Sequence, residues 1–137
     1  MECKKVFLDS NIVLDILNSS RSQSEEAKLL WKELVVNDID IVISEDMLST
    51  VFYINKNKKT TLEFFNVIRR RWIISSFGEK LIEDAIAISL EKNLDLEDVL
   101  QCLCAKNNKC DILITNDKKF YDCGVKIMSI KEFLDEK

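Results

Sequence analysis

The order of apolar and polar residues divides the chain into short apolar runs and longer periodic stretches. Short runs rich in β-branched and aromatic residues, each bounded by polar residues, are typical of β-strands. The predicted strands are Lys5–Leu8, Ile39–Ile43, Ile73–Ser75, Asp111–Ile114 and Val125–Met128. Because these runs are nearly continuous in apolar residues, we expect strands that are buried on both faces.

In the stretches between these runs, apolar residues recur at helical spacing. The predicted helices are Asn11–Leu17, Ser22–Asn37, Glu45–Asn55, Thr60–Trp72, Glu79–Lys92, Leu96–Lys106 and a final turn or two at Ile130–Leu134. Ser22 followed by Glu25 fits a capping box at the start of the second helix. The alternation predicts an α/β three-layer sandwich with a central parallel sheet of four to five strands flanked by helices. No break in composition marks a linker, so residues 1–137 are predicted to form a single domain.

The composition supports a globular intracellular protein. The chain is 47% apolar and 32% charged, and its longest apolar runs are far too short to cross a membrane. The first five residues lead directly into a strand, so we expect no secretory signal, no membrane partner and a cytoplasmic location. The five cysteines lack the paired spacing of a zinc site, and we expect reduced, mostly buried thiols.

The residues that are absent exclude several kinds of catalysis. The chain has no histidine, which excludes Ser-His-Asp and Cys-His catalysis and any histidine base. Its only glycines are Gly78 and Gly124, so there is neither a P-loop nor a dinucleotide-binding fingerprint. Any chemistry must therefore depend on carboxylates, hydroxyls, lysine or a metal.

Three aspartates occupy positions at which parallel sheets bind ligands. Asp9 follows the first predicted strand, Asp117 follows the fourth, and Asp98 lies in the first turn of the sixth helix. Ligands bind beyond the carboxyl ends of the strands, where the strand order switches. If the first and fourth strands are neighbours, the three carboxylates gather at one edge. They cannot all ionise side by side without a cation, so the pattern predicts a site for Mg²⁺ or Mn²⁺.

Each aspartate also has a purely structural interpretation. Asp9 could cap the helix that begins near Asn11. Asp95 and Asp98 have the spacing of a capping pair, and Asp117 could be an ordinary turn residue. The functional interpretation depends on all three lying at the same predicted edge.

Three segments together resemble the PIN-domain nucleases. The opening segment Val6–Asp15 has a hydrophobic strand, an aspartate, a small hydroxyl residue, an asparagine and an apolar helix. The segment Asp95–Gln101 resembles the one that carries the family's third acid. Three further stretches together resemble the family's C-terminal motif: Ile114–Phe120, Val125–Met128 and Lys131–Leu134. The resemblance covers essentially the whole chain, in the family's order.

The resemblance implies a metal-dependent ribonuclease that cleaves phosphodiester bonds of RNA. Asp9, Asp98 and Asp117 would be its metal ligands and catalytic residues. Many members of the family are toxins of bacterial toxin–antitoxin pairs, usually dimeric, which implies an antitoxin protein and a second copy of the chain as partners. The residues that would order the site are Ser10, Asn11, Thr50, Asp95 and Thr115.

One departure from the family pattern keeps other functions open. The family generally has a second acid on the helix after the second strand, where this chain has Thr50. Glu45 and Asp46 lie at the start of that helix, where they suit the helix dipole. A catalytically impaired PIN-like domain that binds RNA or protein is one alternative. A phosphate-handling receiver or phosphatase is another, although the phosphatase would need an acid at Asn11.

The charge is uneven along the chain. The net charge is −4, but the segment 55–72 contains six basic residues and one acid. We therefore expect Arg69, Arg70, Arg71 and Lys118 to bind RNA. The alternative is a solvated helix face whose side-chain stems cover apolar surface.

Overall fold

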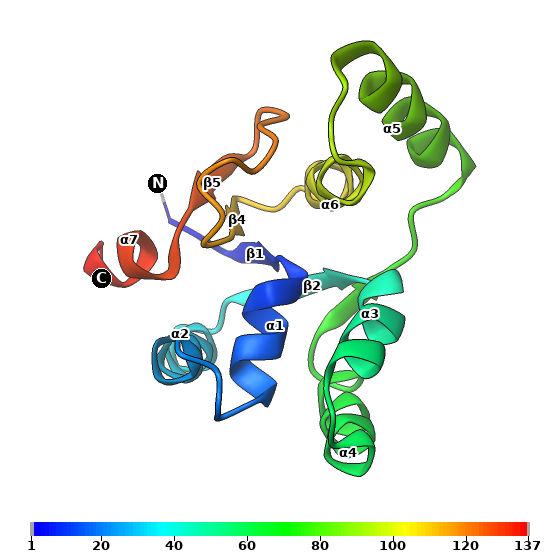
Figure 1. The fold of residues 1–137 in the computed structure, drawn as a ribbon. Coiled ribbons are helices and arrows are strands. Elements are labelled where there is room, and N and C mark those ends of the chain that lie inside the picture. Colours follow the sequence, from blue (N-terminus) through cyan, green and yellow to red (C-terminus); the bar gives the residue numbers. More distant parts are fainter. Residues whose placement is uncertain (1, 137) are drawn as a thin grey trace.

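The structure is a computed structural model that describes residues 2–136, and it confirms the predicted α/β fold (Figure 1). The strands are β1 (Lys5–Leu8), β2 (Asp40–Ser44), β3 (Ile73–Ser75), β4 (Ile112–Ile114) and β5 (Lys126–Met128). The helices are α1 (Ser10–Leu17), α2 (Ser24–Val36), α3 (Asp46–Ile54), α4 (Lys58–Ile68), α5 (Glu79–Lys92), α6 (Leu96–Asn107) and α7 (Ile130–Asp135).

The five strands form one parallel sheet in the order β3-β2-β1-β4-β5. β1 is central, and its residues Val6, Phe7 and Leu8 are fully buried. The chain adds β2 and β3 on one side of β1 and then returns to add β4 and β5 on the other. The strand order therefore switches between β1 and β4, the place where such sheets bind ligands.

Helices cover both faces of the sheet. α6 packs on one face over β2 and β4, and α5 packs against α6. Figure 1 shows α1, α2, α3, α4 and α7 on the opposite face. No helix within residues 2–136 is long and apolar enough to cross a membrane.

The predicted helices differ from the structure by a few residues at several ends, and two of the differences have a clear physical reason. α2 begins at Ser24, after a Gln23 whose side chain makes no capping bond, rather than with a Ser22 capping box. The preceding turn is fixed by the 2.6 Å ion pair between Arg21 and Asp15. α4 ends at Ile68 rather than Trp72, because Trp72 turns inward onto Trp31, with ring centroids 5.6 Å apart.

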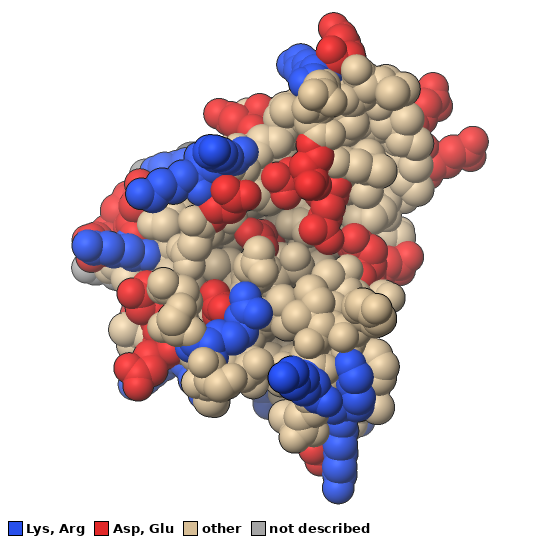
Figure 2. Space-filling model, viewed as in Figure 1, with Lys and Arg blue, Asp and Glu red and all other residues tan. Residues whose placement is uncertain are grey.

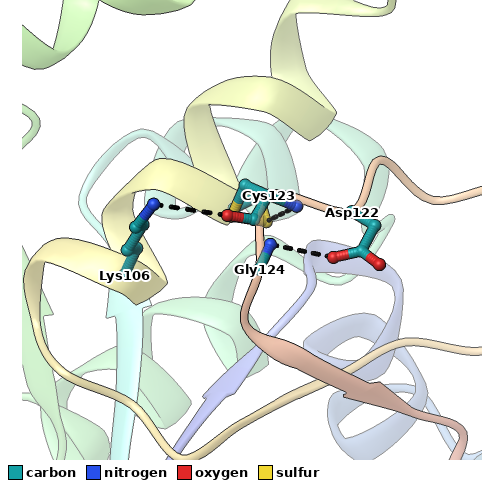
Figure 3. Close-up of a disulfide and its surroundings, with 5 residues drawn as sticks. Lys106, Asp122, Cys123 and Gly124 are labelled. Carbon is teal, nitrogen blue, oxygen red and sulfur yellow. Dashed lines mark hydrogen bonds between the residues drawn. A yellow bond between two sulfur atoms is a disulfide. The ribbon is translucent and has the colours of Figure 1, made fainter.

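The expectation of reduced cysteines is wrong for two of the five. Cys102 of α6 and Cys123, which precedes β5, form a disulfide (Figure 3). Lys106 donates a hydrogen bond to the Cys123 carbonyl at 3.4 Å beside it. The two cysteines are 21 positions apart, and only the packing of α6 beside the β4–β5 loop brings them together. Cys104 and Cys110 are buried thiols, and burial raises the pKa of Cys110 to about 12.

Candidate active site

The carboxyl ends of β1 and β4 bring the first and last predicted acids to the switch point. Asp9 follows β1 and its N–H donates to the Ile114 carbonyl of β4 at 3.2 Å. The Thr115 hydroxyl donates a hydrogen bond to Asp9 Oδ2, and the N–H of Asp117 donates to the same hydroxyl at 3.1 Å. Thr115 therefore links Asp9 and Asp117 directly across two neighbouring strands.

Asp9 is only 4% exposed, and no lysine or arginine side chain within residues 2–136 forms an ion pair with it. Burial raises its pKa, and the charges of Asp117 and Asp15 add to that effect. Hydrogen bonds from Thr115 and from the N–H of Asn11, the latter at 2.6 Å, act in the opposite direction. The bond from Asn11 also makes Asp9 the N-cap of α1. Asp9 is therefore both a helix cap and one of the acids at the carboxyl ends of β1 and β4, which we call the acidic edge.

Asp117 is fixed by the turn that follows β4. Its Oδ1 accepts the N–H of Lys119 at 2.9 Å. The side chain of Asn116 accepts the N–H of Ile130 at 3.1 Å, which ties the same turn to the start of α7. The turn therefore holds Asp117 at the sheet edge and leaves Lys118 exposed beside it.

The first turn of α6 supplies Asp98. Asp95 is the N-cap and accepts the N–H of Asp98 at 3.2 Å, as one structural interpretation predicts. Burial raises the pKa of Asp98 to about 6, and the charges of Asp95, Asp117, Asp9 and Glu97 add to the increase. The electrostatic influence of Asp9 and Asp117 on Asp98 places the start of α6 beside the switch point.

Figure 2 shows acidic side chains gathered at the centre of this face, below the start of α6. Within residues 2–136, no three acidic or cysteine side chains lie close enough to hold an ion as they stand. The carboxylates thus share one edge without converging on one point. Crowded, partly buried oxygen ligands without a compensating cation suit a hard divalent ion, and binding one requires these side chains to turn toward each other.

Two further acids belong to this edge, and sequence reasoning missed their role. Burial and then the charges of Asp46, Asp95 and Asp9 raise the pKa of Glu97. Asp46 begins α3 just beyond β2, and it accepts a hydrogen bond from the buried hydroxyl of Ser44. The rule that selected Asp9 and Asp117, an acid just after a strand, would also have selected Asp46.

Thr50 lies one turn after Asp46 on α3 and is half-buried. Its side chain makes no hydrogen bond to the rest of the described chain. Asp46 therefore provides a carboxylate on the α3 side of the site, which Thr50 does not.

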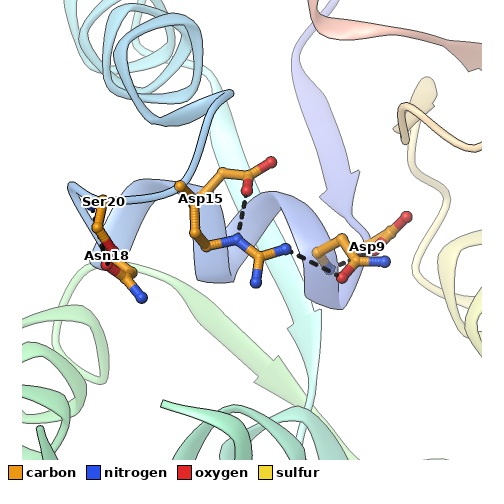
Figure 4. A network of polar contacts seen from close by, with 6 residues as sticks. Asp9, Asp15, Asn18 and Ser20 are labelled. Carbon is orange, nitrogen blue, oxygen red and sulfur yellow. Dashed lines mark hydrogen bonds and ion pairs between the residues drawn. The ribbon is translucent and has the colours of Figure 1, made fainter. Parts of the chain in front are cut away.

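Polar side chains lie along α1, from Asp9 at its start to Asn18 and Ser20 beyond its end (Figure 4). Ser10 is buried in the first turn, and the Asn11 side chain accepts a hydrogen bond from Arg21 at 3.4 Å. Arg21 also donates to Asp15, which is 5% exposed, at 2.6 Å. The network holds Asn11 in position next to Asp9.

The structure separates the three predicted RNA-binding arginines from the acids. Arg69, Arg70 and Arg71 lie in the turn before β3, at the amino ends of the parallel strands. Arg71 lines a pocket there with Asp38 and Asp40, at the start of β2. Of the predicted RNA-binding residues, only Lys118 lies at the acidic edge.

Comparisons with known proteins agree with this architecture. The PIN domain family matches residues 6–126. Ribonuclease VapC1 of Aquifex aeolicus (strain VF5) is 32% identical over 139 residues, which cover 98% of this chain and 96% of that protein. The family resemblance predicted from the sequence is confirmed.

Solved structures share the fold at lower identity. A toxin–antitoxin complex from Klebsiella pneumoniae matches with a TM-score of 0.70 and 21% identity, covering 91% of this chain and 97% of the other. VapC20 of Mycobacterium tuberculosis, a toxin that cleaves the sarcin–ricin loop, matches with a TM-score of 0.71 and 13% identity, covering 88% and 95%. VapBC2 from Rickettsia felis, bound to a promoter DNA fragment, matches with a TM-score of 0.67 and 20% identity, covering 91% and 98%.

Proposed function

Because the chain belongs to the PIN-domain family, we propose that it is a ribonuclease that depends on Mg²⁺ or Mn²⁺. The observation that carries the proposal is the gathering of carboxylates at the β1–β4 switch point, where burial and neighbouring acids raise the pKa values of Asp9 and Asp98. The similarity to a ribonuclease along nearly the whole chain supports RNA as the substrate.

Asp9, Asp98 and Asp117 would hold the ion, and Asp46 would provide the carboxylate that the family generally has at the position of Thr50. The ion, when bound, would activate a water molecule and stabilise charge on the phosphate. Thr115 orients Asp9 and the turn of Asp117 through its hydroxyl. Asn11 and Asp95 fix the starts of α1 and α6 through hydrogen bonds with Asp9 and Asp98, and Ser10 is buried in the first turn of α1.

The biological role that we propose is that of a toxin of a cytoplasmic toxin–antitoxin pair. One solved structure with this fold is a toxin–antitoxin complex, and another is a toxin. An antitoxin protein and a second copy of the chain are therefore the expected protein partners. Expression that arrests growth, and its relief by a small protein encoded beside this chain, would support the role.

RNA cleavage with added Mn²⁺ tests the enzymatic proposal. We expect cleavage that stops with excess chelator and falls at least 100-fold in Asp98→Asn, since loss of several kcal/mol of charge stabilisation exceeds two powers of ten. Lys92→Glu, on the last turn of α5, is a surface control outside the acidic edge. Cleavage that persists in chelator contradicts the proposal.

Thr50 is a specific observation that favours the alternative function, a catalytically impaired domain. In that case the wild-type protein binds RNA and Mn²⁺ but does not cleave. Thr50→Glu should then produce cleavage, because it restores the carboxylate of the family pattern. If wild type cleaves and Asp46→Asn does not, Asp46 provides the missing acid.

A further inference from the structure

The acidic edge needs cations beside it to hold a polyanion, and the three arginines at the opposite edge cannot supply them. A groove of about 430 Å³ lies between the α1–α2 turn and the α3–α4 turn. Its polar lining includes Asn18, Ser20, Arg21, Lys56, Asn57 and Thr60. None of the described residues that line it is acidic.

We propose that this groove binds a backbone phosphate of single-stranded RNA, a few nucleotides from the bond that is cut. The inference rests on the proposed ribonuclease function and adds a substrate site to it. The groove would hold one end of the RNA, while Lys118 lies on the other flank of the acidic edge.

The donors of the groove are partly held in place and partly unused. Arg21 is fixed by Asp15 through its Nε, and its Nη1 has no partner within residues 2–136. The side-chain Oδ1 of Asn57 accepts the N–H of Thr60 at 3.0 Å, and the side-chain amide N–H groups of Asn57 make no hydrogen bond within residues 2–136. Lys56 is exposed and makes no hydrogen bond or ion pair in the described chain. These groups are the charged and neutral donors that phosphate oxygens require.

Lys58 neutralises the negative end of α3 beside the groove. The C-terminal carbonyls of α3 form a negative helix end that would repel a phosphate. The ammonium of Lys58 donates to the carbonyls of Tyr53 at 3.2 Å and Asn55 at 2.8 Å. It also lies 4.8 Å from the centre of the Phe52 ring. The negative end is thus neutralised, and the start of α4, the positive end of its dipole, faces the groove.

α1 links the groove to the acidic edge, because Leu17 at its end lines the groove and Asp9 caps its start. Arg21 contacts Asn11, whose N–H contacts Asp9, as Figure 4 shows for the side chains of this network. α1 is eight residues long, about 12 Å at 1.5 Å per residue. Figure 2 shows basic side chains gathered below the acidic cluster on the same face. A strand of RNA can therefore contact both places at once.

The test is binding of a single-stranded RNA oligonucleotide in excess chelator, followed by fluorescence anisotropy across a salt series. We expect Lys56→Glu to weaken binding about tenfold and to flatten the slope of log K against log salt by about 0.7 for each lost phosphate contact. Lys92→Glu makes the same charge change on α5 and should bind as wild type does.

A second variant removes the guanidinium without leaving a buried unpaired charge. Asp15→Asn combined with Arg21→Gln should also weaken binding and flatten the salt slope. Thermal melts of all variants verify folding, and Lys56→Glu, at an exposed residue without hydrogen bonds, keeps the test decisive if the double variant unfolds.

Three outcomes would contradict the proposal that the groove binds RNA. One is equal RNA binding by Lys56→Glu and Lys92→Glu. Another is loss of binding only when Arg69, Arg70 and Arg71 are replaced by Ala. The third is poly-glutamate that binds wild type as tightly as RNA and loses affinity in Lys56→Glu, which would assign the groove to an acidic protein. The binding test is carried out in chelator, where no metal-dependent cleavage occurs. Its result therefore does not depend on whether the protein cleaves RNA.

Discussion

Asp111 and Asp9 both lie beside β1, at opposite edges of the sheet, and their surroundings differ sharply. Asp111, just before β4, accepts the N–H groups of Lys4 at 2.8 Å and Lys5 at 3.1 Å. Asp9, just after β1, accepts one N–H and one hydroxyl, and it faces other carboxylates. At the amino edge Asp111 accepts hydrogen bonds from backbone N–H groups, whereas at the carboxyl edge the charges of neighbouring acids raise the pKa values of Asp9 and Asp98.

The difference shows what each edge contributes. The hydrogen bonds from Lys4 and Lys5 to Asp111 join the starts of β1 and β4. At the carboxyl edge, burial and mutual repulsion disfavour ionisation of Asp9, Glu97 and Asp98, whose pKa values are all raised. Such crowding opposes folding in the absence of a cation and favours binding one. The four predictions below test this contrast.

The largest expected effect is that of Asp9→Asn on cleavage and on Mn²⁺ binding. Cleavage should fall at least 100-fold, for the reason given above for Asp98. The metal-free variant should melt at or above the wild-type temperature, because Asn can still cap α1 and one crowded charge is gone. Wild type should gain melting temperature with Mn²⁺, and the variant should gain little. A variant that melts several degrees lower without metal and still responds to Mn²⁺ would make Asp9 a structural cap only.

Removal of the disulfide should have the next largest effect, on stability. The bond ties α6, which runs between the two edges of the sheet, to the β4–β5 loop. Replacing Cys102 and Cys123 together by Ser should lower the free energy of unfolding by about 3 kcal/mol, the chain-entropy value for a closed loop of this size. Chemical denaturation measures the loss. Reductant should destabilise wild type and leave the double variant unchanged. Equal sensitivity of both proteins to reductant would contradict the prediction.

Asp111→Asn should lower the free energy of unfolding by about 1–2 kcal/mol, because two backbone N–H groups lose a charged acceptor. Its response to Mn²⁺ and its cleavage activity should match those of wild type. Thermal melts with and without Mn²⁺ provide the measurement. If Asp111→Asn abolishes the Mn²⁺ response, the two edges do not divide stability and metal binding as we infer.

The smallest effect is a pH dependence at the carboxyl edge. The pKa of Asp98 is raised to about 6, so its ionisation destabilises the metal-free protein as pH rises from its ordinary value of about 3.9 through 6. Mn²⁺ binding should strengthen over the same window, since the ion displaces the proton. The Mn²⁺-induced rise in melting temperature should therefore increase from pH 5 to pH 7, and Asp98→Asn should flatten the increase. The same rise in both proteins would assign the pH dependence to another group.

The sequence was informative wherever a signal was local. Periodicity located every strand and helix to within a few residues, and the positions of Asp9 and Asp117 after strands marked the functional edge. It was misleading where contacts distant in the chain decide local structure. The sequence predicts that Trp72 ends a helix and that the three arginines before it lie on a helix face. In the structure Trp72 packs on Trp31, and the helix ends before the arginines.

The sequence by itself determined the fold class, the family and the acids that follow strands, because apolar periodicity and strand-end position are properties of neighbouring residues. Only the tertiary structure decided that the arginines lie at the opposite edge, that Asp46 and Glu97 join the acids, and that Cys102 meets Cys123. The groove of Arg21 and Lys56 also exists only in the folded chain. The physical reason is that strand order and helix packing set these distances, and neither is encoded in the spacing of residues along the chain.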